Sequence, residues 1–264
     1  MLIVQISDMH VSKAGRLFGG RVDSRAAFER CVAHVLGLDP APDLVLLTGD
    51  LAETGVLEEY DFIASQLKRV ALPVLAIPGN HDERDAMAAA LEQHISRQDA
   101  GHLSFLCDDF PLRVIGLDTL VPNAIHGELD RDRLEWLDAT LSKSAKPTLI
   151  AMHHPPFKTG LAAMDNYGIK RGLGDFLEIL KSQPQIVGVI CGHAHRPIAA
   201  SAAGVPVLLC PSSAFPFQLD LKPTARLQFI AEPAQVAIHS WSAEHGLVSH
   251  LSMIDPFPGP FALS

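Results

Sequence analysis

Short apolar runs alternate with amphipathic stretches along most of the chain. The apolar runs lie at 2–6, 44–47, 74–77, 112–117, 148–152, 186–191 and 205–210 and predict strands. Between them, residues 24–38, 57–70, 130–141 and 173–183 carry apolar side chains at helical spacing. Strands that alternate with helices in this way are typical of βαβ units, so the pattern predicts a layered α/β fold.

The last 40 or so residues have a different pattern. Residues 227–232, 235–241 and 246–253 read as hairpin-like strands with few helical signals. The Pro-rich segment 255–264 predicts an extended arm or a contact with a second subunit. No repeat of fixed period and no long linker interrupts the chain.

Composition narrows the function classes. The 264 residues are 48% hydrophobic, enough to bury a large core, and the formal charge of −9 disfavours binding to a long nucleic acid. The four cysteines have no CxxC spacing, so we expect no disulfide scaffold and no thiolate zinc site. The N-terminus lacks a basic region, and no apolar run approaches the length of a membrane span. We therefore expect a soluble, cytoplasmic protein.

Side chains that can bind a metal ion follow five of the predicted strands. Any one of them alone could be a polar residue entering a turn, but five such strand ends are hard to explain as coincidence. Since loops from several strands meet at the carboxyl ends of an α/β sheet, we expect these side chains to share one site. They are Asp8 and His10, then Asp50, then Asn80, His81 and Asp82, then His153 and His154, and last His193 and His195.

The types and spacing of these residues suit divalent ions. Asp8 and His10 are two residues apart in a chain that leaves a strand, so their side chains can reach one ion. The carboxylate of Asp50 has two oxygens and could bridge two ions. Imidazole, carboxylate and amide ligands without thiolate fit Fe, Mn, Zn or Co and do not select among them.

In order, the motifs SDMH (7–10), GD (49–50), PGNHD (78–82), HHPP (153–156) and GHAH (192–195) resemble the calcineurin-like metallophosphoesterases. The likeness is greatest to the bacterial branch that cleaves cyclic nucleotides and glycerophosphodiesters. It implies a four-layer αββα sandwich with a strand-rich C-terminal part, in which residues 1–220 form the catalytic core. Residues 221–264 would complete the sandwich or form a subunit contact.

The resemblance also implies two divalent ions and a role for each ligand. Asp8, His10 and His195 would hold one ion, Asn80, His154 and His193 the other, and Asp50 would bridge them. Metal-bound hydroxide would attack phosphorus. We expect Asp50 and His81 to be the catalytic side chains, with His81 contacting the phosphate or protonating the leaving alkoxide.

Several neighbouring residues keep two interpretations. Asp82 and His153 could orient a ligand or simply stabilise a loop. Phe215 and Phe217 could form a wall of the substrate pocket together with His81, or pack in the core. Arg16 and Arg21 could meet a second substituent of the substrate or be solvated. In the loop 157–172, the weaker candidates for specificity are Asp165, Asn166 and Tyr167.

The resulting hypothesis is a dinuclear metal-dependent phosphodiesterase for small diesters, either 3′,5′-cyclic nucleotides or glycerophosphodiesters. A phosphomonoesterase or nuclease of the same superfamily is the alternative. A non-catalytic scaffold is disfavoured because all seven ligands and His81 are present, and a β-lactamase-like hydrolase because its HxHxDH motif is absent. We expect a homo-oligomer, because the C-terminal strands and tail are apolar.

Overall fold

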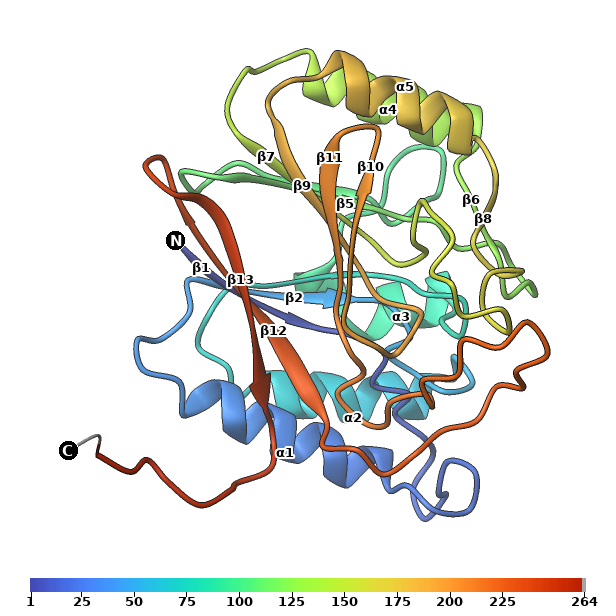
Figure 1. Cartoon of the computed structure of the whole chain (residues 1–264), viewed down its shortest axis with the longest axis vertical. Helices are drawn as coiled ribbons and strands as arrows, with labels where there is room; N and C mark the ends of the chain where they lie inside the picture. Colours follow the sequence, from blue (N-terminus) through green and yellow to red (C-terminus); the bar gives the residue numbers. More distant parts are fainter. Residues whose placement is uncertain (263–264) are drawn as a thin grey trace.

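Two β-sheets face each other at the centre of the computed structural model, which describes residues 1–262 (Figure 1). The first sheet has the order β13-β12-β1-β2-β3 and the second β10-β11-β9-β7-β5-β4. The first contains β1 (Leu2–Ile6), β2 (Leu44–Thr48), β3 (Val74–Ile77), β12 (Gln235–Ser242) and β13 (Gly246–Met253). The second contains β4 (Phe105–Cys107), β5 (Arg113–Leu117), β7 (Thr148–Met152), β9 (Ile186–Cys191), β10 (Ile198–Ala202) and β11 (Val205–Leu209).

Helices cover the outer face of each sheet. α1 (Ser24–Leu36), α2 (Leu57–Leu67) and α3 (Arg84–Ala90) share a buried cluster with the first sheet, and the short 3₁₀ turn Glu92–His94 follows. α4 (Arg131–Leu141) and α5 (Leu173–Ser182) pack on the second sheet. The Asp130 side chain accepts a hydrogen bond from the Arg133 amide and so caps α4. The predicted four-layer α/β sandwich is therefore confirmed.

The apolar runs of the central strands follow from this layering. Every residue of β2 is buried, with Val45 and Leu47 packed toward the helices and Leu44 and Leu46 toward the other sheet. Because side chains alternate between the faces of a strand, a strand covered on both sides must be apolar throughout. Such a run has no polar face to reveal its register, which is why it reads as a plain hydrophobic segment.

The C-terminal strands join the first sheet. β12 pairs antiparallel with β1, and β13 forms the edge beyond it. The strand predicted at 227–232 is wrong, since only an isolated bridge joins Phe229 to Phe217. This segment bonds to another loop and not to a sheet: the Ile230 amide donates to the Pro216 carbonyl and the Gln218 amide to the Gln228 carbonyl.

Short elements are absent from the sequence prediction, namely α3, β4, β10 and the small pair β6 (Gly127–Glu128) and β8 (Ile169–Arg171).

Within residues 1–262 there is no helix with the length and apolar character needed to cross a bilayer.

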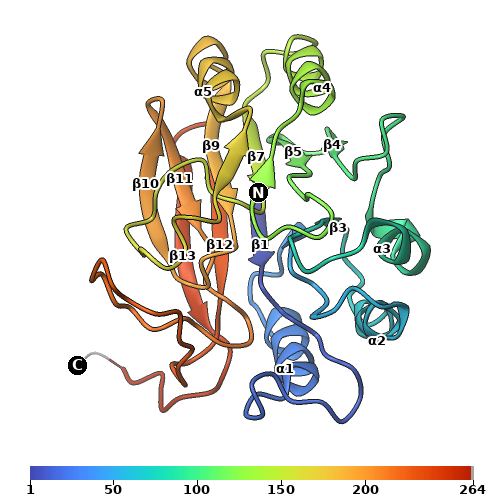
Figure 2. The ribbon, with the colours of Figure 1, turned by 90° about the vertical axis from the view of Figure 1, so that its right-hand side faces the viewer.

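The topology brings the ends of strands from both sheets to one side of the molecule. β1, β2 and β3 run parallel to each other, as do β5, β7 and β9. Their carboxyl ends lie on the right-hand side of Figure 1, the side that faces the viewer in Figure 2. The long connections 155–168 and 210–234 lie on the same side.

Candidate metal centre

Unusual backbone geometry marks the residues that follow the strands. Among residues 1–262, seven non-glycine residues have a positive φ, and five of these are candidate ligands. Such conformations cost energy and persist where the surroundings hold them in place for a function. The five are Asp8, His10, Asp50, His193 and His195, with φ between 45° and 71°.

Two glycines let these strand ends approach each other. A Cβ atom on Gly79 would collide with the backbone and carboxylate of Asp50. One on Gly192 would collide with the Ser7 hydroxyl and come within 2.8 Å of the Asp8 carboxylate. Glycine at both places therefore allows the ends of β2 and β3, and of β1 and β9, to bring their polar side chains together.

One group of potential ligands contains Asp8, His10 and His195. The two Nε2 atoms of His10 and His195 are 3.0 Å apart, and His195 Nε2 is 3.5 Å from Asp8 Oδ1. The Nδ1 atoms of both rings face acceptors, the Glu53 carboxylate at 2.8 Å and the Phe215 carbonyl at 2.9 Å. Because Nδ1 of each neutral ring must carry the proton there, the two Nε2 lone pairs face each other. A cation between them removes this conflict.

A second group contains Asn80, His153 and His193. Asn80 Oδ1 lies 2.9 Å from His193 Nδ1 and 3.2 Å from His153 Nε2. The Nδ1–H of His153 donates to the Thr48 carbonyl at 2.8 Å, so its Nε2 faces the other potential ligands. His193 Nε2 is buried without a hydrogen-bond partner. Ligand atoms about 2.1 Å from one ion lie roughly 3.0–3.4 Å from each other, so these spacings fit an ion.

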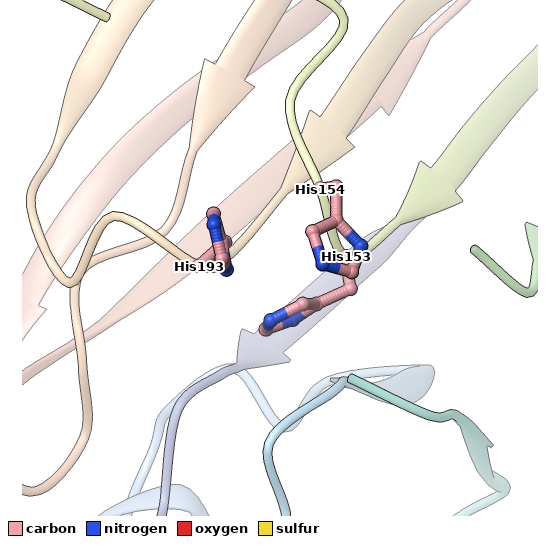
Figure 3. A group of neighbouring side chains, drawn as sticks. All are labelled: His153, His154 and His193. Atoms are coloured by element: carbon pink, nitrogen blue, oxygen red, sulfur yellow. The ribbon is translucent and has the colours of Figure 1, made fainter. Parts of the chain in front are cut away.

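His154 has the opposite surroundings, although its sequence neighbour is His153. The rings of His153, His154 and His193 converge from the ends of β7 and β9 (Figure 3), with one nitrogen of each within 4.8 Å of the others. However, Nε2–H of His154 donates to the Ile125 carbonyl at 3.0 Å, and its Nδ1 accepts from the Thr119 hydroxyl at 2.7 Å. Both nitrogens are thus engaged, and the geometry favours His153 over the sequence-predicted His154 as a ligand.

Asp50 lies between the two groups. Its Oδ2 atom is 3.6 Å from His10 Nε2 and 3.4 Å from His153 Nε2, while Oδ1 accepts from the His81 amide at 2.8 Å. The side chain is 3% exposed. A buried carboxylate in contact with both groups can bridge two ions.

The electrostatics of the centre favour cations. Burial raises the pKa of Asp8 to about 6, although the nearby His153 opposes this shift. Burial lowers the pKa of His153, but the Asp50 carboxylate more than compensates and raises it to about 9. Burial also holds the pKa values of His193 and His195 well below the ordinary range. A positive charge is therefore stabilised beside Asp50, while the two GHAH imidazoles stay neutral, as metal ligands must be.

His81 and Asp82 have different roles. The Nδ1–H of His81 donates to the Glu53 carbonyl at 2.9 Å, so its Nε2 is the nitrogen left for a ligand or proton transfer. The Asp82 carboxylate accepts from the amides of Gly79, Leu51 and Ala52 and from the Tyr60 hydroxyl. It therefore stabilises the loops after β2 and β3, and its hydrogen bonds do not include His81.

A cavity of about 230 Å³ lies over the centre. Phe217 lines it and stacks on His195, with 3.9 Å between ring centroids. Phe215 also borders the cavity but is 1% exposed and packs between the rings of Phe18 and His195. The other apolar side chains of the lining are Phe18, Ile125, Met164, Tyr167 and Leu227.

The remaining sequence candidates lie outside this cavity. Arg16, Arg21 and Asn166 are not among its lining residues, and both arginines are exposed. Asp165 accepts from the Thr159 and Gly160 amides and stabilises its own loop.

Two residues of the site are absent from the sequence prediction. They are Glu53, which orients His10, and Phe18, which lies between Arg16 and Arg21 in the sequence and stacks on Phe215. An acidic residue three positions after Asp50 and an aromatic residue in the loop after His10 were the available signals.

Comparisons with known proteins bear on the family and the fold of this chain. The family model described as calcineurin-like phosphoesterase matches residues 1–197. A protein of Arcobacter nitrofigilis described as a probable glycerophosphodiester phosphodiesterase is 36% identical over 99% of this chain and 96% of its own. A 3′,5′-cyclic adenosine monophosphate phosphodiesterase of Pseudomonas aeruginosa is 30% identical over 82% of this chain and 78% of its own. The crystal structure of a dimetal phosphatase from Danio rerio has the same fold, with a TM-score of 0.62 and 14% identity over 97% of this chain and 99% of that one.

Proposed function

Because this chain belongs to the calcineurin-like phosphoesterase family, we propose that its centre hydrolyses small phosphodiesters with the help of two divalent metal ions. The relatives named as phosphodiesterases match most of the chain, which supports a metal-dependent phosphodiesterase. The observation that carries the proposal is the convergence of acceptor atoms on both sides of Asp50. The proposed substrates are cyclic nucleotides or glycerophosphodiesters. In both, the phosphate group carries a single negative charge.

In this proposal Asp8, His10 and His195 would hold one ion, and Asn80, His193 and His153 would hold the other. His153 replaces His154 of the sequence-based set because its Nε2 faces Asn80 and Asp50. Asp50 would contact both ions. The mixture of nitrogen and oxygen ligands suits Fe, Mn, Zn or Co.

Such ions, when bound, supply a nucleophile at neutral pH and offset the negative charge that develops on the phosphate. The chain itself fixes the geometry. Glu53 holds the proton of His10 on Nδ1, and the Phe215 carbonyl does the same for His195. His81 lines the cavity and donates its Nδ1–H to the Glu53 carbonyl, so Nε2 is the nitrogen left for proton transfer. When Nε2 also carries a proton, the imidazolium can give that proton to the leaving alkoxide and become the neutral Nδ1–H tautomer.

The test is hydrolysis by metal-free protein to which Mn²⁺, Zn²⁺, Co²⁺ or Fe²⁺ is added back. We expect activity on 3′,5′-cyclic AMP, on glycerophosphoethanolamine or on both, with little on p-nitrophenyl phosphate. Faster cleavage of the monoester than of any diester would favour the alternative function, a phosphomonoesterase. Full activity in the metal-free protein would overturn the metal requirement.

The assembly and location of the protein remain proposals. The apolar side chains Val248, Leu251 and Met253 are 39–47% exposed on the edge strand β13, which supports a homo-oligomer. Light scattering of the purified protein tests this directly. A cytoplasmic location, the division of the chain at residue 220 and the lack of binding to long nucleic acids stay predictions from the sequence.

A further inference from the structure

Two cavities, and not one, adjoin the centre. Besides the apolar cavity over the ligands, there is a second one of about 330 Å³, and Asn80 and His81 line both cavities. An acyclic phosphodiester carries two separate organic substituents on one phosphorus, whereas both ester oxygens of a cyclic nucleotide belong to one ribose. The phosphate of an acyclic diester bound at the centre can therefore direct one substituent to each cavity.

The two cavities differ in chemistry. Beyond the centre and its histidines, the first is lined by apolar and aromatic side chains, including Phe217, Ile125 and Leu227. Ile125 and Leu227 are 49% and 47% exposed, so apolar surface is available there for a substrate to cover. An alkyl or aromatic substituent gains most from such a site.

The second cavity is lined mainly by polar residues, with Leu120 and Pro122 as its apolar members. Arg84 uses Nε and Nη2 to bind the buried Asp118 carboxylate at 2.7 and 2.9 Å, and Nη2 also donates to the Leu120 carbonyl. These bonds hold the guanidinium in place and leave Nη1 for a ligand. The exposed Asn123, with φ of 62°, and Thr54 also line this cavity. Donors and acceptors of this kind recognise hydroxyl groups.

We infer that the two cavities sort the substituents of an asymmetric diester, placing an apolar or aromatic group beside Phe217 and Leu227 and a hydroxyl-bearing group beside Arg84 and Asn123. This inference rests on the proposed phosphodiesterase function. Among acyclic diesters, the preferred substrate is then one with an apolar alcohol on one ester oxygen and a polyol or sugar on the other.

The test uses two synthetic diesters with the same p-nitrophenolate leaving group, one with a glyceryl and one with a propyl substituent. Mn²⁺-loaded wild-type protein should cleave the glyceryl diester with a kcat/KM about 3–10-fold higher, the effect expected of one or two hydrogen bonds. Asn123→Gly keeps the positive φ but removes the side-chain amide, and should bring that ratio close to 1, mainly by lowering kcat/KM for the glyceryl diester. Arg84→Lys, which keeps the charge near Asp118, should lower the same ratio.

The apolar side is tested with Leu227→Ala and a matched control. This variant should raise KM for both p-nitrophenyl diesters without changing the glyceryl-to-propyl ratio. Leu221→Ala, at a residue that is 64% exposed and outside the cavity lining, should change neither. As a readout that needs no turnover, calorimetry should show glycerol 3-phosphate binding more tightly than propyl phosphate in the wild type but not in Asn123→Gly.

The outcomes separate this inference from the function on which it rests. Equal kcat/KM values for both diesters in the wild type, or an equal loss on both in Asn123→Gly, would overturn the two-sided arrangement and leave the phosphodiesterase intact. If neither diester were cleaved at any metal loading, the proposed function itself would fail, and this inference with it.

Discussion

Two groups of buried histidines in this molecule have opposite surroundings. Between the sheets, His239 Nε2–H donates to Gln5 Oε1 at 3.0 Å, and its Nδ1 accepts from the Ser249 hydroxyl at 2.7 Å. The Gln5 amide then donates to the Thr48 hydroxyl and the Cys191 carbonyl. Every polar atom of this network meets a complementary partner. In the metal centre, acceptor atoms of His10, His195, Asp8 and Asp50 face each other instead.

The difference shows that burial alone does not identify a metal ligand. All of these rings are buried, but only those in the centre have a nitrogen whose partner must be a proton or a metal ion. By this criterion His154, whose two nitrogens are both paired within the protein, resembles His239 more than it resembles His153. Complementary pairing stabilises the fold, whereas its absence in a rigid, buried site indicates a bound cation.

Removing the carboxylate of Asp50, the proposed bridge, should have the largest effect. Asp50→Asn keeps the shape but replaces one of the two oxygens by an amide nitrogen and removes the negative charge. We expect activity to fall by on the order of 10³-fold, since in the proposed arrangement both ions lose a charged ligand. Metal content measured by plasma mass spectrometry should fall below one ion per chain. Asp61→Asn, at an exposed carboxylate, is the control. An Asp50→Asn protein that kept two ions and full activity would contradict the bridging role.

The adjacent histidines sharpen the comparison. His153→Ala should lose one ion and about 10²-fold or more in activity, because an ion loses a direct ligand. His154→Ala should retain both ions but unfold at a lower urea concentration. We expect the free energy of unfolding to fall by roughly 1–3 kcal/mol, because the Thr119 hydroxyl and the Ile125 carbonyl lose their hydrogen-bond partner. Calorimetric titration with Mn²⁺ and urea unfolding measure the two effects. The reverse pattern would restore His154 as the ligand.

His81 should affect chemistry and not metal binding. His81→Ala should lower turnover about 10²-fold on diesters with a poor alkoxide leaving group, because it removes the proton donor. On p-nitrophenyl diesters, whose leaving group needs no proton, the loss should be much smaller. Metal content should be unchanged. Undiminished activity on alkyl diesters would exclude the acid role.

The hydrogen-bond network of His239, Gln5 and Ser249 should make the stability of the fold depend on pH, through His239. Burial lowers the pKa of His239 to about 4, below its ordinary value near 6.5 in the unfolded chain. The unfolded state therefore binds the proton first, and stability present above pH 6.5 is lost as the pH falls toward 4. Between pH 7 and pH 5, proton binding to His239 in the unfolded chain should lower the free energy of unfolding by about 2 kcal/mol. Measured by urea unfolding, His239→Gln should not lose this ~2 kcal/mol of stability between pH 7 and pH 5. His245→Gln, at an exposed position, should lose as much as the wild type. Equal losses in wild type and His239→Gln would be the contrary result.

The family and the layers of the fold were predictable because they depend on local patterns. Long apolar runs gave β1, β2, β3, β7 and β9 with the bounds observed or within one residue of them. Short elements such as α3 and β4 contain too few residues to show a period, and 227–232 has the composition of a strand but no neighbouring strand with which to pair.

The site was predictable in its residue types but not in its partners. Adjacent histidines such as His153 and His154 cannot be told apart by spacing, because their roles depend on Thr48, Thr119 and Ile125, which come from distant segments. The same is true of Phe215 and Phe217, of which one is buried under the centre and the other lines its cavity. The contacts of these side chains in the folded structure distinguish their roles, whereas the order of the motifs along the chain does not.

The most direct test is a crystal structure of the Mn²⁺-loaded protein with anomalous scattering data. Two peaks should appear on either side of Asp50, one in contact with Asp8, His10 and His195 and the other with Asn80, His153 and His193. A single peak, or a second peak bound by His154 with His153 turned away, would contradict the assignment of the centre.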